Sequence, residues 1–228
     1  MTPKIIALCS RKPQSGKDTV AEQFKFELKC AGNKVMTIAF ADALRHNVAS
    51  LFGNDKYPMI MERLTCSAKD IAITELAIYN VKHEDYRKFL LNQHPNIQYN
   101  QPLSPRFHMQ QFGNNYIKGH IGLEDHWVNI VHREVTGFKG SRFDYVLITD
   151  ARSEVEFNWI DLMDGRVIQI EPVCFPEARA VAEHNHPVEL FDYSDYVWAT
   201  VRNVWGRPET ARDDIQSLFN EELHGIKP

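Results

Sequence analysis

Residues 4–19 read KIIALCSRKPQSGKDT, a short apolar run followed by a polar turn and a Gly-Lys pair. The apolar run from Lys4 to Ser10 is consistent with a buried parallel strand. After the turn, Val20, Phe24 and Leu28 are spaced four residues apart, as on one face of an amphipathic helix. We therefore expect a strand, a turn and a helix over this stretch.

The rest of the chain continues to alternate strands with helices. Further strands are expected at 35–40, 145–149, 166–170 and 196–201, and helices at 42–52, 153–163 and 208–223. Residues 54–140 contain no strong strand pattern and are expected to form a mostly helical insertion, with helices at 68–91, 106–113 and 125–135. Alternating strands and helices predict an α/β fold with a parallel sheet of about five strands flanked by helices, in a single domain over 1–228.

The polar turn resembles the phosphate-binding P-loop, G-x-x-x-x-G-K-[ST]. Gly16 and Lys17 match this pattern, Arg11 replaces the first glycine, and Asp18 followed by Thr19 replaces the hydroxyl residue. Backbone N–H groups in such a turn, together with a helix N-terminus, bind anions, and the lysine lies over the β and γ phosphates. A solvated surface turn is the alternative, but the apolar strand before it and the amphipathic helix after it favour a phosphate site.

The turn supplies the predicted ATP-binding residues. They are Lys12, Ser15, Gly16, Lys17, Asp18 and Thr19. A carboxylate near phosphates repels them unless a cation intervenes. The hypothesis is that Asp18 holds Mg²⁺, directly or through water, while Thr19 bonds the α-phosphate.

A second candidate cluster follows the third expected strand. Asp150 ends this strand, where P-loop proteins place an acidic residue that holds Mg²⁺ or its water. Arg152 is suited to clamp a transferred phosphate, and Glu156 on the next helix is suited to orient it. The alternative is that these acidic residues only complement the helix dipole. Because ligands of parallel sheets bind beyond the carboxyl ends of the strands, the turn and this cluster are expected to form one site.

An acceptor that carries a phosphate needs several cations, because two anionic phosphates must approach each other. Arg45, Arg106 and Lys118 are candidates, and Gln110 lies on the same helix face as Arg106. A cation of this kind, taken alone, is more often a solvated surface charge. Trp127 is suited to stack on a base, but an interior position is an equal alternative.

The composition excludes several classes of function. The chain has 228 residues, 26 Lys and Arg against 30 Asp and Glu, and a formal net charge of −4. This lacks the basic excess of proteins that bind nucleic acid polymers. The four cysteines and ten histidines show no metal-ligand spacing, which indicates reduced thiols in the cytoplasm. There is no signal-peptide pattern and no apolar run long enough to span a membrane.

Several segments resemble phage deoxynucleoside monophosphate kinases, within the P-loop NMP-kinase superfamily. The similar pieces follow the family's order: SGKDTVAE at 15–22, FADALR at 40–45, PRFHMQQFG at 105–113, Trp127, ITDARSEVE at 148–156, HPVE at 186–189 and SDYV at 194–197. An Asp after the P-loop lysine is normal in this family. Arg11, Asn114-Asn115 and the unplaced segment 54–104 depart from its pattern.

The resemblance implies ATP and Mg²⁺ as cosubstrates and the conversion of a deoxynucleoside monophosphate to a diphosphate for DNA precursor synthesis. It places the protein in the host cytoplasm, if phage-encoded, and leaves a homodimer open. It implies as catalytic residues Lys17, Asp18, Arg106, Asp150 and Arg152. It implies as acceptor residues Asp42, Arg45, Arg106, Gln110, Lys118, Trp127, Arg152 and Glu156. Asp18 and Asp150 would hold the Mg²⁺.

Other readings remain. Phosphomevalonate kinases of animal type share the form K-x-S-G-K-D but are not expected to show the run at 106–113 with Trp127. Dephospho-coenzyme A kinase normally has a hydroxyl residue after the lysine. A nucleotide-binding protein without kinase activity is a third reading, disfavoured by the intact second cluster. Residues 172–189, with Arg179, are the candidate for a lid over the phosphates.

Overall fold

The structure is a computed structural model that describes residues 2–12, 15–174 and 191–220. Contacts within the chain define two compact units. One consists of Met1–Phe40 and Val131–Pro228, and the other of Ala41–Ile130. The first unit contains the sheet, and the second overlaps the predicted insertion at 54–140 over residues 54–130.

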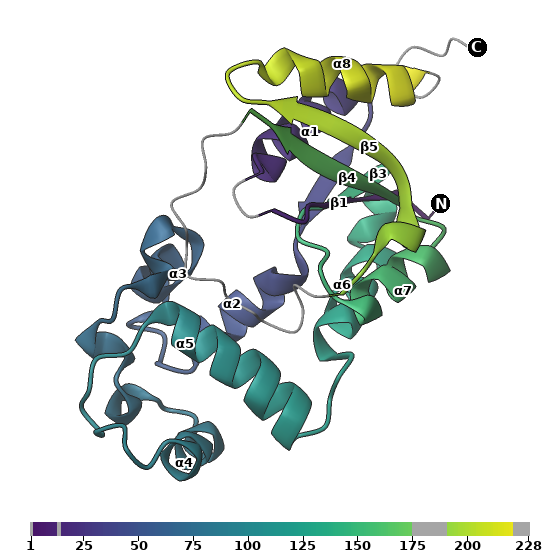
Figure 1. Ribbon diagram of the computed structural model, residues 1–228. Helices are drawn as coiled ribbons and strands as arrows, with labels where there is room; N and C mark the ends of the chain where they lie inside the picture. Colours follow the sequence, from purple (N-terminus) through teal and green to yellow (C-terminus); the bar gives the residue numbers. More distant parts are fainter. Residues whose placement is uncertain (1, 13–14, 175–190, 221–228) are drawn as a thin grey trace. The chain divides into compact units, whose positions relative to one another are not determined.

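Five parallel strands form one sheet in the order β2-β3-β1-β4-β5 (Figure 1). They are β1 (Lys4–Cys9), β2 (Val35–Ile38), β3 (Tyr145–Ile148), β4 (Arg166–Val173) and β5 (Val197–Val204). In the central strand β1, every residue from Ile5 to Cys9 is buried. A strand covered on both faces has no need to alternate apolar with polar residues, which explains its continuous apolar sequence. The predicted α/β class with about five parallel strands is confirmed.

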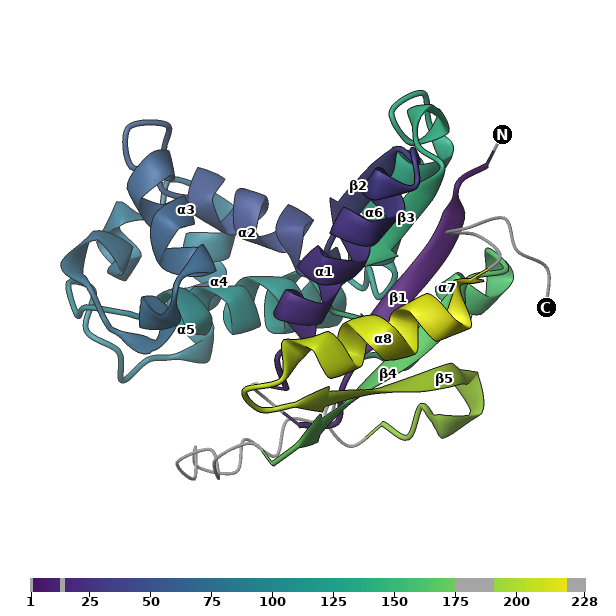
Figure 2. The same ribbon diagram turned by 90° about the horizontal axis from the view of Figure 1, so that it is seen from above.

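Helices cover both faces of this sheet (Figures 1 and 2). One face carries α1 (Lys17–Cys30) and α8 (Pro208–Leu218), and the other carries α6 (His126–Thr136) and α7 (Glu154–Leu162). Two helical turns, η5 (Gly140–Arg142) and η7 (Ser194–Tyr196), precede β3 and β5. A bond of 3.1 Å from the Trp159 indole N–H to Nδ1 of His132 joins α6 and α7.

The face under α1 and α8 is closed by aromatic packing. Phe24 of α1 is fully buried, and its ring lies 4.7 Å, centroid to centroid, from that of Phe219. Val20 and Leu28 complete the buried stripe of α1, as the four-residue spacing predicted. The stripe packs on Ile6 and Leu8 of β1, so this side of the central strand is buried.

The second unit is built from short helices and helical turns. They are α2 (Phe40–Ser50), α3 (Tyr57–Thr65), η1 (Ser67–Asp70), η2 (Thr74–Leu76), η3 (Ile78–Asn80), α4 (Glu84–Gln93), α5 (Pro105–Gln110) and the π-helical η4 (Gln111–His120). Its core contains a buried polar pair, in which Tyr86 bonds Nδ1 of His108 and Nε2 of the same ring meets the carbonyl of Leu76 at 2.7 Å. Burial lowers the pKa of His108 to about 4, which keeps the imidazole neutral at physiological pH.

The helix predicted over 68–91 is wrong over most of its length. Three 3₁₀ turns precede α4, and α3 was not expected. Ile73 is extended and forms a bridge with Leu103, which a β-branched residue tolerates well. Buried Asn80 donates to the carbonyl of Thr74 at 3.0 Å, so a side chain holds the turns that the helix pattern did not reveal. Ile71, inside the predicted helix, lies outside every helical turn and is 57% exposed.

Several element boundaries differ from the sequence prediction. The second strand ends at Ile38, and Phe40 begins α2 instead of ending the strand. Strands β4 and β5 both extend about three residues further than predicted, to Val173 and Val204. Of the predicted lid at residues 172–189, the part from residue 175 onward, which includes Arg179, lies outside the described residues. Among the helices of the described chain, none has the length and apolarity needed to cross a membrane.

Replacing Phe24 by Ala should lower the free energy of unfolding by about 3–5 kcal/mol, because it leaves a cavity beside Phe219. The matched control is Phe26→Ala on the same helix, where the ring is 64% exposed and the change should stay within about 0.5 kcal/mol. Urea unfolding of the three proteins measures both. Equal loss in the two variants would contradict the assignment of the buried helix face.

Candidate functional site

The turn between β1 and α1 depends on one glycine. Gly16 has φ 72° and ψ 16°, a left-handed conformation that residues with a Cβ rarely adopt. Its carbonyl accepts the first helical bond, from the N–H of Val20 at 3.0 Å. Among the described residues, no side chain caps this end of α1. The first backbone N–H groups of this 14-residue helix therefore lie directly beside the turn, without a side-chain cap.

Lys17 joins the two loops that the sequence singled out. Its amine donates to the carbonyl of Thr149, which follows β3. Burial lowers the pKa of Lys17, and the nearby positive charge of Arg152 lowers it further, while Asp150 and Asp18 act in the opposite direction. Two cations and two carboxylates from the predicted set thus lie within electrostatic reach of one another.

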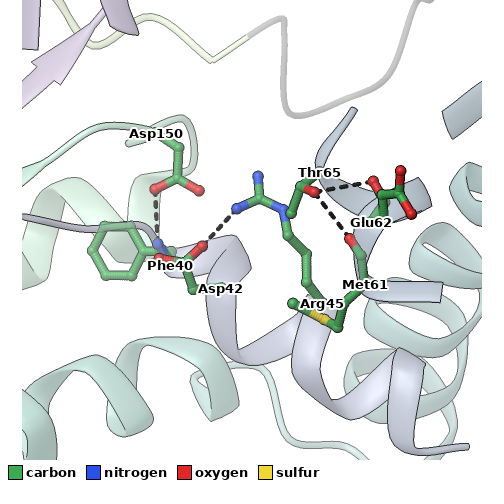
Figure 3. A network of polar contacts seen from close by, with 7 residues as sticks. All are labelled: Phe40, Asp42, Arg45, Met61, Glu62, Thr65 and Asp150. Atoms are coloured by element: carbon green, nitrogen blue, oxygen red, sulfur yellow. Dashed lines mark hydrogen bonds and ion pairs between the residues drawn. The ribbon is translucent and has the colours of Figure 1, made fainter. Parts of the chain in front are cut away.

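The carboxylate of Asp150 holds backbone as well. One of its oxygens accepts a hydrogen bond of 2.7 Å from the N–H of Phe40, the first residue of α2 (Figure 3). It therefore satisfies one of the N–H groups that an α-helix leaves open at its start. Asp150 is half-buried at the carboxyl end of β3, as the sequence predicted for an acidic residue after the third strand.

Glu156 acts on the main chain of the second loop. Its carboxylate accepts from the N–H of Arg152 at 2.7 Å and from that of Ser153 at 3.0 Å. The bond from Ser153, the N-cap residue, is the reciprocal half of a helix capping box at the start of α7. Glu156 thereby fixes the backbone from which the exposed Arg152 side chain extends, which is a different way of orienting it than a bond to the guanidinium.

The two aspartates suit Mg²⁺ in chemistry and in number. Asp18 is exposed in the first turn of α1, and both Asp18 and Asp150 interact with the charge of Lys17. Mg²⁺ prefers oxygen ligands and is usually bound by one or two carboxylates together with substrate phosphates and water. No group of three metal-binding side chains occurs in residues 2–12, 15–174 and 191–220. Two carboxylates are compatible with a metal that a phosphate ligand and water would also coordinate.

Sequence reasoning missed the partners of the turn itself. Arg11, which replaces the P-loop glycine, forms an ion pair of 2.6 Å with Asp192 and lies over the Tyr193 ring at 5.2 Å from its centroid. Buried Asn203 in β5 donates to the carbonyl of Ser15 at 2.8 Å. A polar residue at an inward position of an apolar strand was the available signal for Asn203. The role of the Thr149 carbonyl had no signal in the sequence, because every residue has a backbone carbonyl.

The predicted acceptor cations lie in the second unit, and both of its predicted arginines are paired with carboxylates. Arg45 contacts Asp42 at 2.6 Å within α2 (Figure 3). Arg106 forms a two-pronged ion pair with Asp70, in which Nη2 and Oδ2 lie 3.1 Å apart. Bidentate pairing fixes the orientation of a guanidinium, so Arg106 is held in one direction.

The other three predicted acceptor residues have different environments. Gln110 is exposed, and Lys118 is half-buried. Trp127 is only 6% exposed, and its ring packs against Phe112 and His126. Its indole N–H is buried without a hydrogen-bond partner in the described part of the chain. The interior alternative for Trp127 is thus the one seen in the structure, with a donor left over.

No protein-family model and no curated protein matches this sequence. Among solved structures, a protein described as a plasmid partition protein from Borrelia burgdorferi B31, bound to AMPPNP, is 16% identical, with 97% of this chain and 100% of that chain covered and a TM-score of 0.36. An iodide-soaked plasmid partition protein from the same species is 17% identical, with coverage of 96% and 99% and a TM-score of 0.36. Likeness at this level does not bear on activity.

The thiol beside the turn should be unreactive in the folded protein. Cys9 ends β1, and burial raises its pKa to about 12, whereas Cys30, Cys66 and Cys174 are exposed. At about pH 8 a thiol reagent should modify three cysteines in the native state and the fourth only after denaturation, because the thiolate is the reactive form. Mass spectrometry of the labelled peptides identifies the protected residue. Rapid native labelling of Cys9 would contradict the burial of β1.

Proposed function

We propose that this protein is a kinase that transfers the terminal phosphoryl group of ATP, with Mg²⁺, to a deoxynucleoside monophosphate. The observation that carries the proposal is the position of Lys17, partly buried at the start of α1 and close to Arg152, Asp150 and Asp18. The deoxynucleotide acceptor is supported by the similarity of the sequence segments to phage deoxynucleoside monophosphate kinases.

The state of Lys17 favours an anionic ligand. Its pKa is lowered because the charged amine loses water, and Arg152 adds repulsion. The negative charge of a phosphate chain near the amine would counteract both effects and would favour the charged form. The open N-terminus of α1 adds hydrogen-bond donors and a favourable dipole for the same anion.

The neighbouring residues have complementary tasks in transfer. Arg152 is exposed and charged beside Lys17, so it can follow the phosphoryl group as charge moves during in-line displacement. Asp18 and Asp150 would hold Mg²⁺, which neutralises phosphate charge when bound. An acceptor phosphate is largely ionised at neutral pH, so this chemistry needs positioning and cations more than a strong base.

The acceptor would be bound by Arg45, Arg106, Gln110 and Lys118. In the structure the two arginines are paired with Asp42 and Asp70, which hold the guanidinium groups in place and reduce their net charge. An acceptor phosphate would therefore compete with a carboxylate for each arginine. Such competition lowers affinity and favours ligands that also bond through the base.

The decisive experiment measures ADP release from ATP and Mg²⁺ with a panel of acceptors. The panel contains the four common deoxynucleoside monophosphates, hydroxymethylated pyrimidine monophosphates, the matching ribonucleotides and phosphomevalonate. Turnover with a deoxynucleotide supports the proposal and names the base. Turnover with phosphomevalonate alone would assign a different acceptor. If ATP is hydrolysed at the same rate with and without each acceptor, the protein is an ATPase and not a kinase. If ATP binds but is not turned over, the protein is a nucleotide-binding protein without this activity.

Lys17→Ala and Arg152→Ala should each lower kcat/KM by on the order of 10²-fold or more, because each removes a cation that stabilises the transferred phosphate. The matched control is Arg142→Ala, because Arg142 precedes β3 and Arg152 follows it at the opposite end of the strand. The control should retain full turnover. Thermal unfolding of all variants separates lost chemistry from lost folding, and near-normal turnover in folded Lys17→Ala and Arg152→Ala proteins would exclude the mechanism.

A further inference from the structure

Asn203 is one of the few buried polar side chains in the described part of the chain. It lies near the end of β5, pairs with Pro172 of β4, and is 6% exposed. Val201, two residues earlier, is fully buried on the same face of the strand. Burying an amide without a hydrogen bond costs free energy, and the structure shows where the Asn203 amide is used. Its Nδ2 donates to the carbonyl oxygen of Ser15 at 2.8 Å.

The bonded carbonyl belongs to the peptide that carries the N–H of Gly16. A trans peptide is planar, with its C=O and N–H pointing in opposite directions. A bond that fixes the Ser15 oxygen toward Asn203 therefore fixes the Gly16 N–H away from Asn203. Ser15 is itself only 3% exposed, so water has little access to compete for this carbonyl.

Gly16 needs such an external restraint. Glycine allows the left-handed conformation seen here, but it also allows many others, so it does not hold the peptide by itself. Beyond this residue the helical bonds of α1 take over, beginning with the bond from Val20 to Gly16. The Ser15–Gly16 peptide is the last peptide before α1, and the helical hydrogen bonds of α1 do not restrain it.

We infer that Asn203 is a positioning residue, which sets the direction of the Gly16 N–H and thereby the affinity of the turn for a phosphate chain. The inference rests on the proposed function, since that function makes a nucleotide phosphate the ligand of the turn. Asn203 acts through the Ser15–Gly16 peptide, from a strand about 190 residues away in sequence. Arg11, paired with Asp192, fixes the start of the same turn from the segment that precedes β5.

The test measures binding of Mg-ATP and of inorganic tripolyphosphate by calorimetry, without turnover. Asn203→Leu removes the donor without adding charge, and Asn203→Asp keeps the shape while placing an oxygen against the Ser15 carbonyl. Both should raise the dissociation constants by about tenfold, equivalent to about 1.4 kcal/mol. Val201→Ala is the matched control, since it also weakens the core of β5 but should leave both constants within about twofold of wild type.

The amide NMR signal of Gly16 provides a second readout that general destabilisation would not move. In the wild type it should shift on addition of tripolyphosphate, and in Asn203→Leu the shift should be smaller at saturation. Wild-type affinity in folded Asn203→Leu would overturn the inference. Equal weakening in Val201→Ala would overturn it too, because the effect would then be structural. If the wild type binds ATP but phosphorylates no acceptor, the kinase proposal is overturned, and the role of Asn203 is still decided by the binding measurements. If the wild type binds neither ATP nor tripolyphosphate, both proposals are overturned.

Discussion

The contact between the amine of Lys17 and the carbonyl of Thr149 brings the candidate site together. It exists because β1 and β3 are neighbouring parallel strands whose residues Ala7 and Ile148 lie opposite each other. Their carboxyl ends therefore meet at one edge of the sheet, and each is followed by a charged loop. The electrostatic interactions of Lys17 with Asp150 and Arg152 follow from this pairing of strands.

Two carboxylates of the candidate site also stabilise the fold. Asp150 satisfies the start of α2, and Glu156 satisfies the start of α7. Helix starts and phosphate chemistry both require charge near backbone N–H groups, so the same residues suit both tasks. Substituting either residue would change helix capping together with any catalytic role. A loss of activity in such variants therefore cannot be assigned to chemistry without a parallel measurement of stability.

The sequence predicted the features that depend on local pattern. The apolar run of β1, the four-residue spacing of α1 and the glycine at residue 16 all follow from backbone and periodicity, and the structure agrees with each. It did not predict bonds that depend on the tertiary fold, such as Asn203 to Ser15 or Asp70 to Arg106. These join residues 188 and 36 positions apart, and no local rule relates them.

The helical segment was predicted less well for a related reason. Its turns are held by particular side chains, such as Asn80 and His108, and not by a periodic apolar face. A pattern with β-branched residues and short apolar intervals gives a similar signal for a helix and for successive 3₁₀ turns. Only the tertiary contacts of buried polar groups distinguish the two.

The ion pair between Arg11 and Asp192 has a thermodynamic consequence. Because it joins the phosphate-binding turn to the segment before β5, the conformations of these two parts form a coupled equilibrium. Coupling of this kind is reciprocal in free energy, so an anion that favours the paired conformation of the turn would stabilise the segment by as much as the pairing strengthens anion binding. Anion binding at the turn would then also change the conformational equilibrium of the segment at residues 191–196, although about 180 residues separate the two along the chain.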